Sequence, residues 1–264
     1  MVTDASLREP PSSDTGSHRR LPLSSAMEVP HDRPTPPDQP VTRPRLVLVH
    51  GAWHQPWVWG PLIRQLPDWT VDLVDLPSSK PDVLGDLAAD VAAVRAELIR
   101  EDGPVAVMAH SYGGIPASEA ISGVPGVVHT VYLGAFLPSP GDSLLSMVGT
   151  DPSWWKRNED AGTIGVVDPA QRFYSDLAPD LVSAAVDHLR PQSARSFEGQ
   201  VRRPSRARDT MTYMVCDADQ AIPPAAQQAM GEGCAAVFHL DTGHTPMLAD
   251  TAAVAAVLHD RLSD

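Results

Sequence analysis

The chain contains little cysteine, few basic residues and no long apolar run. It has two cysteines in 264 residues, Cys216 and Cys234, too few for a disulfide framework or a four-cysteine zinc site. Its 20 basic residues are outnumbered by 33 acidic ones, giving a formal net charge of −13, which argues against nucleic acid or an anionic membrane as a partner. No apolar segment approaches the ~20 residues of a transmembrane helix. We therefore expect a cytoplasmic globular protein.

Proline is concentrated near the N-terminus. Residues 28–44 are polar and repeatedly interrupted by proline, at Pro30, Pro34, Pro36, Pro37, Pro40 and Pro44. Such a segment has too little apolar surface to offset the entropy lost on folding. It also lacks the apolar stretch of about 7–15 residues that a secretion signal requires. We predict that residues 1–44 form a disordered proline-rich tail and that residues 45–264 form one domain.

From residue 45 onward, short apolar segments alternate with helical patterns. Strands are predicted over 45–50, 70–75, 104–110, 126–134, 210–216 and 235–240. Helices are predicted over 57–66, 82–100 with Asp82 as N-cap, 112–122, 224–231 and 246–262, from apolar residues at helical spacing. This alternation is typical of parallel strands joined by crossover helices, so we predict an α/β fold with a doubly wound, mostly parallel sheet of about six strands.

The alternation stops between residues 138 and 206, after the fourth predicted strand. A helix is predicted over 171–189, and Trp154 and Trp155 lie in a polar neighbourhood. Long insertions at the carboxyl end of a strand are where α/β enzymes place elements that cover the substrate. We therefore predict a helical cap over about 138–206. Its two tryptophans are predicted to line the substrate pocket, although they could equally form the cap's own core.

A candidate nucleophile, Ser111, follows the third predicted strand and opens a helical pattern. The segment 109–113 has the small-x-Ser-x-Gly form of a nucleophile elbow, with Ala109 in place of the first glycine and Gly113 in the last position. Such a turn projects the hydroxyl at a helix N-terminus, where free N–H groups favour a developing anion. A serine that merely caps the helix is the alternative, but the preceding strand and the following glycines favour the nucleophile.

A catalytic serine needs a base that is held by a third group. His244 is the best candidate because it lies on a loop between the last predicted strand and the last predicted helix. His50 and His110 end strands near the site, and we expect them to be buried residues instead. The acid should precede His244, since this type of fold has the chain order Ser, Asp, His. Asp217 and Asp219 both qualify, and we favour Asp219 because Ile222 and a proline follow it closely.

The remaining expected site residues lie in two loops and in the cap. Two backbone amides are needed for a tetrahedral oxyanion, and those of Ala52 and Tyr112 are predicted to supply them. The predicted substrate-pocket residues are Trp53, Phe136, Leu137, Trp154 and Trp155. His50 and His54 are four residues apart but do not share a helix, so no metal is predicted, and no organic cofactor is required.

Five segments together resemble the α/β-hydrolase superfamily, in particular EstC-like esterases, plant methylesterases and hydroxynitrile lyases. They are residues 50–54, 110–114, 132–138, 216–224 and 243–247. The resemblance implies a Ser111–His244–Asp219 triad, an oxyanion hole formed by the Ala52 and Tyr112 amides, and a pocket beneath a small cap. The lyases carry a lysine after the catalytic histidine and a threonine at the position of Gly51. Here Thr245 and Gly51 occupy these positions, which disfavours lyase activity.

We therefore expect a serine hydrolase that cleaves a small or medium hydrophobic carboxylic ester through an acyl-enzyme. Two alternatives stay open. The same pocket could serve biosynthetic chemistry such as cyclisation, lactone opening or C–C bond cleavage, because fold does not fix reaction. It could also belong to a non-catalytic receptor. The expected partner is a small hydrophobic molecule, and a homodimer is compatible with the sequence.

Overall fold

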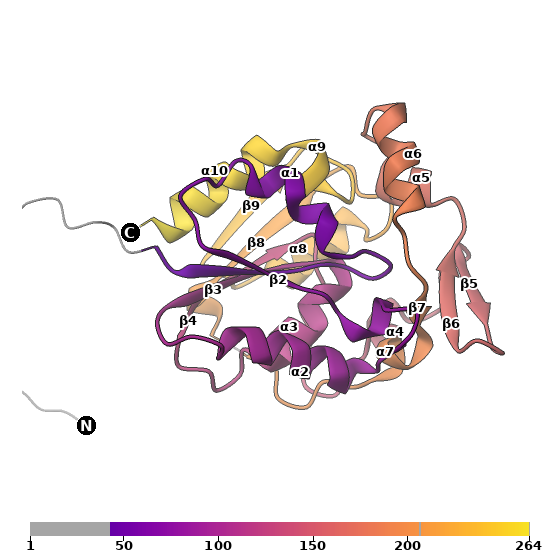
Figure 1. Ribbon diagram of the computed structural model, residues 1–264, viewed down its shortest axis with the longest axis horizontal. Coiled ribbons are helices and arrows are strands. Elements are labelled where there is room, and N and C mark those ends of the chain that lie inside the picture. Colours follow the sequence, from indigo (N-terminus) through magenta and orange to yellow (C-terminus); the bar gives the residue numbers. More distant parts are fainter. Residues whose placement is uncertain (1–42, 206, 264) are drawn as a thin grey trace, which may run out of the picture. The chain divides into compact units, whose positions relative to one another are not determined.

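The computed structural model describes residues 43–205 and 207–263, and its centre is a six-stranded parallel sheet (Figure 1). The strands occur in the order β2-β1-β3-β4-β8-β9. Their bounds are β1 Arg45–Val49, β2 Val71–Val74, β3 Val105–His110, β4 Val127–Leu133, β8 Met211–Cys216 and β9 Ala236–Leu240. All six lie within the predicted segments, so the predicted fold class is confirmed. The predicted tail, residues 1–44, lies outside the described residues apart from 43 and 44, and it stays a prediction.

Helices cover both faces of this sheet. In Figure 1, α1 (Gly60–Ile63), α9 (Pro246–Ala249) and α10 (Thr251–Leu262) lie on one face, while α2 (Leu87–Leu98) and α3 (Gly114–Ala120) lie on the other. The helix α8 (Pro224–Gly231) connects β8 to β9. Short 3-10 helices are η1 Pro56–Trp59, η2 Pro77–Ser79, η3 Ser111–Gly113 and η4 Arg208–Thr210. In the part of the chain that the structure describes, no helix has the length and apolar character needed to cross a membrane.

Two predicted helices begin or continue differently from expectation. Asp82 is not the N-cap of α2; Asp86 is, because its carboxylate accepts a hydrogen bond from the Ala89 N–H at 3.0 Å. Leu84 has a left-handed φ of 46°, which a helix cannot accommodate, so the chain enters the helix only after it. The predicted helix 246–262 is interrupted at Asp250, whose extended φ of −138° separates α9 from α10.

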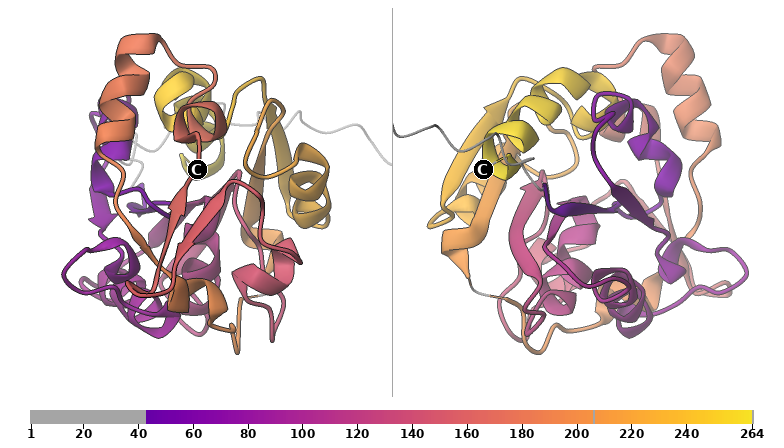
Figure 2. Two further views of the ribbon diagram at one scale, coloured as in Figure 1. Left: turned by 90° about the vertical axis from the view of Figure 1, so that its right-hand side faces the viewer. Right: turned by 60° about the vertical axis from the view of Figure 1, so that its left-hand side comes forward.

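The segment between β4 and β8, predicted as a helical cap and called the cap below, contains strands as well as helices. It contains α4 (Leu144–Val148), α5 (Pro169–Phe173), α6 (Pro179–Asp187) and α7 (Ala194–Glu198). It also contains a three-stranded antiparallel sheet of β5 (Trp155–Asn158), β6 (Thr163–Val166) and β7 (Gln192–Ser193), seen at the right of Figure 1 and facing the viewer in Figure 2, left. The strands β5 and β6 are short and partly exposed, and β7 is buried but has only two residues, both polar, so none of the three sequences shows a buried apolar run. The predicted helix 171–189 is likewise divided between α5 and α6.

Trp53, on the loop after β1, joins the cap to the central sheet. Its ring packs against four cap aromatics with centroid separations of 5.5–6.2 Å: Trp154, Trp155, Phe173 and Phe197. Its backbone N–H donates to Gln192 Oε1 at 3.1 Å, and its indole Nε1–H donates to the Ile164 carbonyl at 2.6 Å. Its carbonyl accepts from the Arg190 N–H at 2.8 Å. All three polar groups of Trp53 are therefore bonded to cap residues.

Candidate active site

Ser111 lies at a tight turn between β3 and α3. Its φ is 53°, a left-handed conformation that is strained for a residue with a side chain. The turn has no room for a larger residue at Gly113, where an added Cβ would lie 2.5 Å from the His50 carbonyl oxygen. The Phe136 N–H fixes the turn further by donating to the Ser111 carbonyl at 3.1 Å. This is the backbone geometry expected of a nucleophile elbow.

The structure brings Ser111, His244 and Asp219 together from three separate loops. Ser111 Oγ lies 3.0 Å from His244 Nε2, and His244 Nδ1 lies 2.8 Å from Asp219 Oδ2. All three residues are buried, and Ser111 is only 7% exposed. The carboxylate accepts the Nδ1 proton, so Nε2 carries the lone pair that can take the proton of the serine hydroxyl. The residues predicted as nucleophile, base and acid thus form one hydrogen-bonded chain.

Asp219 is held by donors that sequence analysis did not identify. Its Oδ1 accepts the N–H groups of Ala221 and Ile222 at 2.7 and 3.0 Å, and its Oδ2 also accepts Gln227 Nε2–H at 2.8 Å. The other candidate acid, Asp217, lies at the surface and bonds to His239 at 2.8 Å. Asp219, the favoured residue, is therefore the one that faces His244.

Three further histidines surround the site as buried groups, as expected for His50 and His110. His110 Nε2–H donates to the His244 carbonyl at 2.7 Å and so helps to hold the loop of the base. Burial and the nearby His244 hold the pKa of His110 well below its usual value. Burial likewise lowers the pKa of His54 to about 3. Both rings are therefore uncharged at neutral pH.

The loop after β1 passes directly against the elbow. An added Cβ at Gly51 would lie 2.8 Å from Ser111 Cβ, so only glycine fits there without displacement. The Gly51 carbonyl accepts His50 Nδ1–H at 2.8 Å. The Ala52 carbonyl accepts His54 Nδ1–H at 2.8 Å, and the Tyr174 hydroxyl donates to His54 Nε2 at 3.0 Å. Ala52 and Tyr112, the predicted amide donors, both line the cavity at Ser111.

A small cavity of about 30 Å³ lies next to the Ser111 hydroxyl. Of the predicted pocket residues, Trp53, Phe136, Trp154 and Trp155 line it. Leu137 does not: its side chain packs with Tyr132 and Tyr213 in a separate apolar cluster, because it follows the bend that turns Phe136 toward the elbow. Sequence analysis missed the other apolar lining residues, Leu144, Val148, Pro152, Phe173, Ala221 and Ile222.

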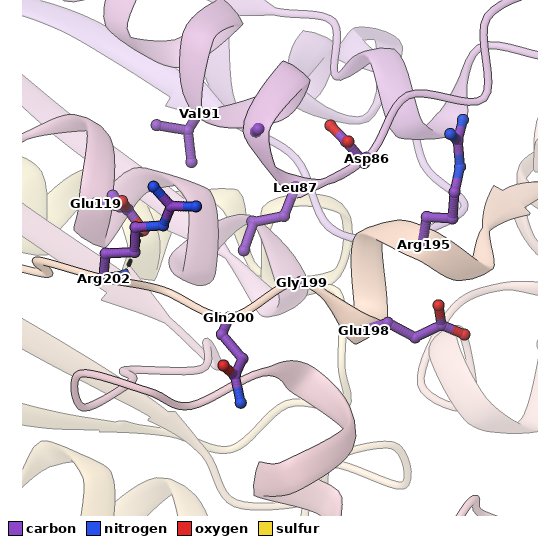
Figure 3. Close-up of a pocket in the computed structure, with 10 residues that line it drawn as sticks. Asp86, Leu87, Val91, Glu119, Arg195, Glu198, Gly199, Gln200 and Arg202 are labelled. Carbon is purple, nitrogen blue, oxygen red and sulfur yellow. Dashed lines mark hydrogen bonds between the residues drawn. The ribbon is translucent and has the colours of Figure 1, made fainter.

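A second hollow, of about 500 Å³, lies between α2 and the chain that follows α7 (Figure 3). Leu87 and Val91 form its apolar part, and charged side chains surround them, including Glu119 and Arg202. The Arg202 N–H donates to Glu119 Oε2 at 2.9 Å. None of the described residues that line this hollow is a serine, cysteine or histidine. Within residues 43–205 and 207–263, no group of histidine, cysteine and acidic residues could hold a metal ion.

These features together are those of an α/β hydrolase: a parallel sheet, a strained serine at the end of β3 and a histidine after β9. The model of the alpha/beta hydrolase family matches residues 46–257. The chain therefore belongs to this family.

Among its relatives, the alpha/beta hydrolase nvfD of Aspergillus novofumigatus is 25% identical over 232 residues, which span 79% of this chain and 92% of the relative. Methylesterase 4 of Arabidopsis thaliana is 34% identical over 105 residues, 36% of this chain and 40% of the relative. The crystal structure of methylesterase MES16 from Arabidopsis has a TM-score of 0.71 at 20% identity, covering 82% of this chain and 98% of that one. The predicted resemblance to α/β hydrolases and plant methylesterases is confirmed.

Proposed function

We propose that this protein is a serine hydrolase that cleaves an apolar carboxylic ester through an acyl-enzyme intermediate. The observation that carries the proposal is the hydrogen-bonded chain from Ser111 Oγ through His244 to Asp219, with distances of 3.0 and 2.8 Å. A serine hydroxyl becomes nucleophilic when such a base removes its proton during attack. The names of similar proteins, which include hydrolases and methylesterases, agree with this reaction class.

In the proposed reaction, Ser111 Oγ attacks the ester carbonyl carbon while His244 Nε2 takes the hydroxyl proton. The tetrahedral intermediate collapses, the bond to the alkoxy oxygen breaks, and His244 returns the proton to the departing alcohol. A water molecule then attacks the acyl carbon while His244 takes its proton, the bond from that carbon to Ser111 Oγ breaks, and His244 returns the proton to Oγ as the carboxylic acid leaves. The carboxylate of Asp219 keeps the proton of His244 on Nδ1 and stabilises the imidazolium that forms in each step.

The tetrahedral oxyanion is proposed to lie between the amides of Ala52 and Tyr112. In a planar trans peptide the carbonyl and the following N–H point in opposite directions. Because the Gly51 carbonyl is bonded to His50, it fixes the direction in which the Ala52 N–H points. The close approach of Gly51 to Ser111 supports this assignment, since the donor must lie near the attacked carbon.

The residues around Ser111 favour ester hydrolysis over cyanohydrin cleavage. The cavity lining contains no lysine or arginine that could stabilise a departing cyanide anion. Thr245, at the position where the resembling lyases carry lysine, is fully buried and donates its hydroxyl proton to the Phe173 carbonyl at 2.7 Å. Its side chain is therefore engaged with the cap rather than offered to a leaving group.

The test is the hydrolysis of p-nitrophenyl acetate by the wild-type protein and by Ser111→Ala, with Ser183→Ala as control. Ser183 is an exposed serine on α6, and its variant should keep full activity. Loss of the proposed nucleophile should reduce kcat by about 10⁶-fold, as in comparable triads. A fluorophosphonate probe should label the wild type and Ser183→Ala but not Ser111→Ala. A folded wild-type protein that neither hydrolyses esters nor reacts with the probe would refute the proposal and favour a receptor.

A further inference from the structure

A large open groove adjoins the small cavity at Ser111. The cavity itself, about 30 Å³, has room for only about two water molecules. The groove beside it measures about 630 Å³, which is within the range of about 300–1,000 Å³ typical of small-molecule sites. The two are adjacent, since six residues line both: Phe136, Val148, Pro152, Trp154, Ala221 and Ile222.

The walls of the groove come from the cap on one side and from the loop and helix after β8 on the other. Met147 and Val148 of α4 contribute the cap wall, while Pro224 and Ala226 of α8 contribute the opposite wall. The lining is apolar except for Asp219 and Gln220. Both Asp219 oxygens already accept hydrogen bonds from the protein. Among the described residues that line the groove there is no lysine or arginine. Arg172 lies at its edge, where the guanidinium donates to the Gln220 carbonyl at 3.3 Å and lies 5.9 Å from the centre of the Trp154 ring.

We propose that this groove binds the longer, uncharged apolar half of the ester substrate while the ester carbonyl lies in the cavity at Ser111. The inference rests on the proposed function and adds to it the class of substrate: an ester with one extended aliphatic or aromatic half and one short half. The short half must fit the 30 Å³ cavity. Burial of the longer half against apolar walls supplies binding free energy of ~25 cal/mol per Å² of apolar surface.

The residues that line both the cavity and the groove, among them Val148, Trp154 and Ile222, are called the junction. Ile222 is only 4% exposed, and its N–H is bonded to Asp219 Oδ1 at 3.0 Å, so this side of the junction is fixed by the same carboxylate that orients His244. In the proposed binding mode, an apolar chain that leaves the cavity for the groove passes between Ile222 and the cap residues of the junction. The position of the reacting carbonyl is thereby linked to the path of the longer half.

The proposal is tested by filling the groove from either wall. Ala226→Trp on α8 and Met147→Trp on α4 place a large ring in the groove without altering a residue that lines the cavity. Ala225→Trp is the matched control, because Ala225 is an exposed neighbour on the same helix that does not line the groove. Two substrate pairs are compared: methyl octanoate with methyl acetate, and octyl acetate with ethyl acetate.

For each pair the measured quantity is kcat/KM for the long ester divided by kcat/KM for the short one. In Ala226→Trp and Met147→Trp this ratio should fall at least about tenfold for one of the pairs, while Ala225→Trp should keep the wild-type ratio. A fall in the octanoate pair assigns the acyl half to the groove, and a fall in the octyl pair assigns the alcohol half.

If all three variants keep the wild-type ratio for both substrate pairs, the groove assignment is overturned and the proposal of ester hydrolysis is unaffected. Failure of the proposed function would instead appear as absence of hydrolysis of both short esters by the wild type. Thermal denaturation of each variant establishes that it is folded, and if one tryptophan variant does not fold, the variant in the opposite wall decides.

Discussion

The replacement Asp219→Asn probes the proposed role of the acid most directly, because the structure dictates how the new amide must lie. The N–H groups of Ala221 and Ile222 both point at Oδ1, so the single oxygen of asparagine must take that position. Its NH₂ group then occupies the place of Oδ2, 2.8 Å from His244 Nδ1. Two donors cannot face each other, so His244 must move its proton to Nε2.

With the proton on Nε2, His244 can no longer accept the proton of Ser111. The Gln227 side chain cannot relieve the conflict by rotating its amide, because its Oε1 accepts the Cys216 N–H at 2.9 Å and its Nε2 also donates to the Ile222 carbonyl at 2.9 Å. We expect kcat to fall by about 10⁴-fold, the loss known for the same exchange in a serine protease triad. At 1.36 kcal/mol per factor of ten, this is about 5 kcal/mol of transition-state stabilisation.

The assay is steady-state hydrolysis of p-nitrophenyl acetate, with Asp217→Asn as control. Asp217 lies on the same loop, but its carboxylate bonds to the exposed His239, so its variant should keep wild-type kcat. Thermal unfolding establishes that both variants are folded. A kcat for Asp219→Asn within tenfold of the wild type would refute the reasoning, because it would mean that the tautomer of His244 does not depend on this carboxylate.

Two further predictions concern stability. Burial lowers the pKa of His54 to about 3 and that of His110 well below its usual value, whereas the unfolded chain binds both protons near pH 6.5. Each ring should therefore lower the free energy of unfolding by up to ~1.4 kcal/mol per pH unit as the pH decreases from 6.5 toward 4.5. Urea unfolding at pH 7.5 and pH 4.5 checks this, and equal stabilities would contradict it. Gly113→Ala should destabilise the fold by about 1–3 kcal/mol, since its Cβ would lie 2.5 Å from the His50 carbonyl oxygen. In Gly60→Ala the added Cβ would meet only Arg64, at 3.9 Å. The free energy of unfolding of this control should lie within about 1 kcal/mol of the wild-type value.

The central sheet could be predicted from sequence because each of its strands is a short apolar run with its own flanking signals. The burial of all residues of β3 and β8 produces those continuous runs. The cap strands β5 and β7 lack this signal, since their hydrogen-bond partners on β6 are set by the folding of the whole insertion. The sequence around Gln192 has no pattern that would predict a strand there.

The candidate site was predictable to a similar degree. Ser111, His244 and Asp219 could be identified from chain order and from their places at the carboxyl ends of strands. Gln227 and Phe173 could not, because both come from helices that reach the site only through tertiary packing. Leu137 was assigned to the pocket wrongly, since its position next to Phe136 gave no indication that the backbone directs the two side chains to different clusters.

The attachment of Trp53 to the cap has a consequence for how the protein admits a ligand. Its N–H, carbonyl and indole N–H are all bonded to the insertion, and the neighbouring Ala52 carries the proposed donor to the oxyanion. Lifting the insertion to widen the 30 Å³ cavity would break these bonds and release the Ala52 backbone. Entry along the open groove beside the cavity would leave these bonds intact, so the proposed oxyanion donor would stay in place while an ester binds.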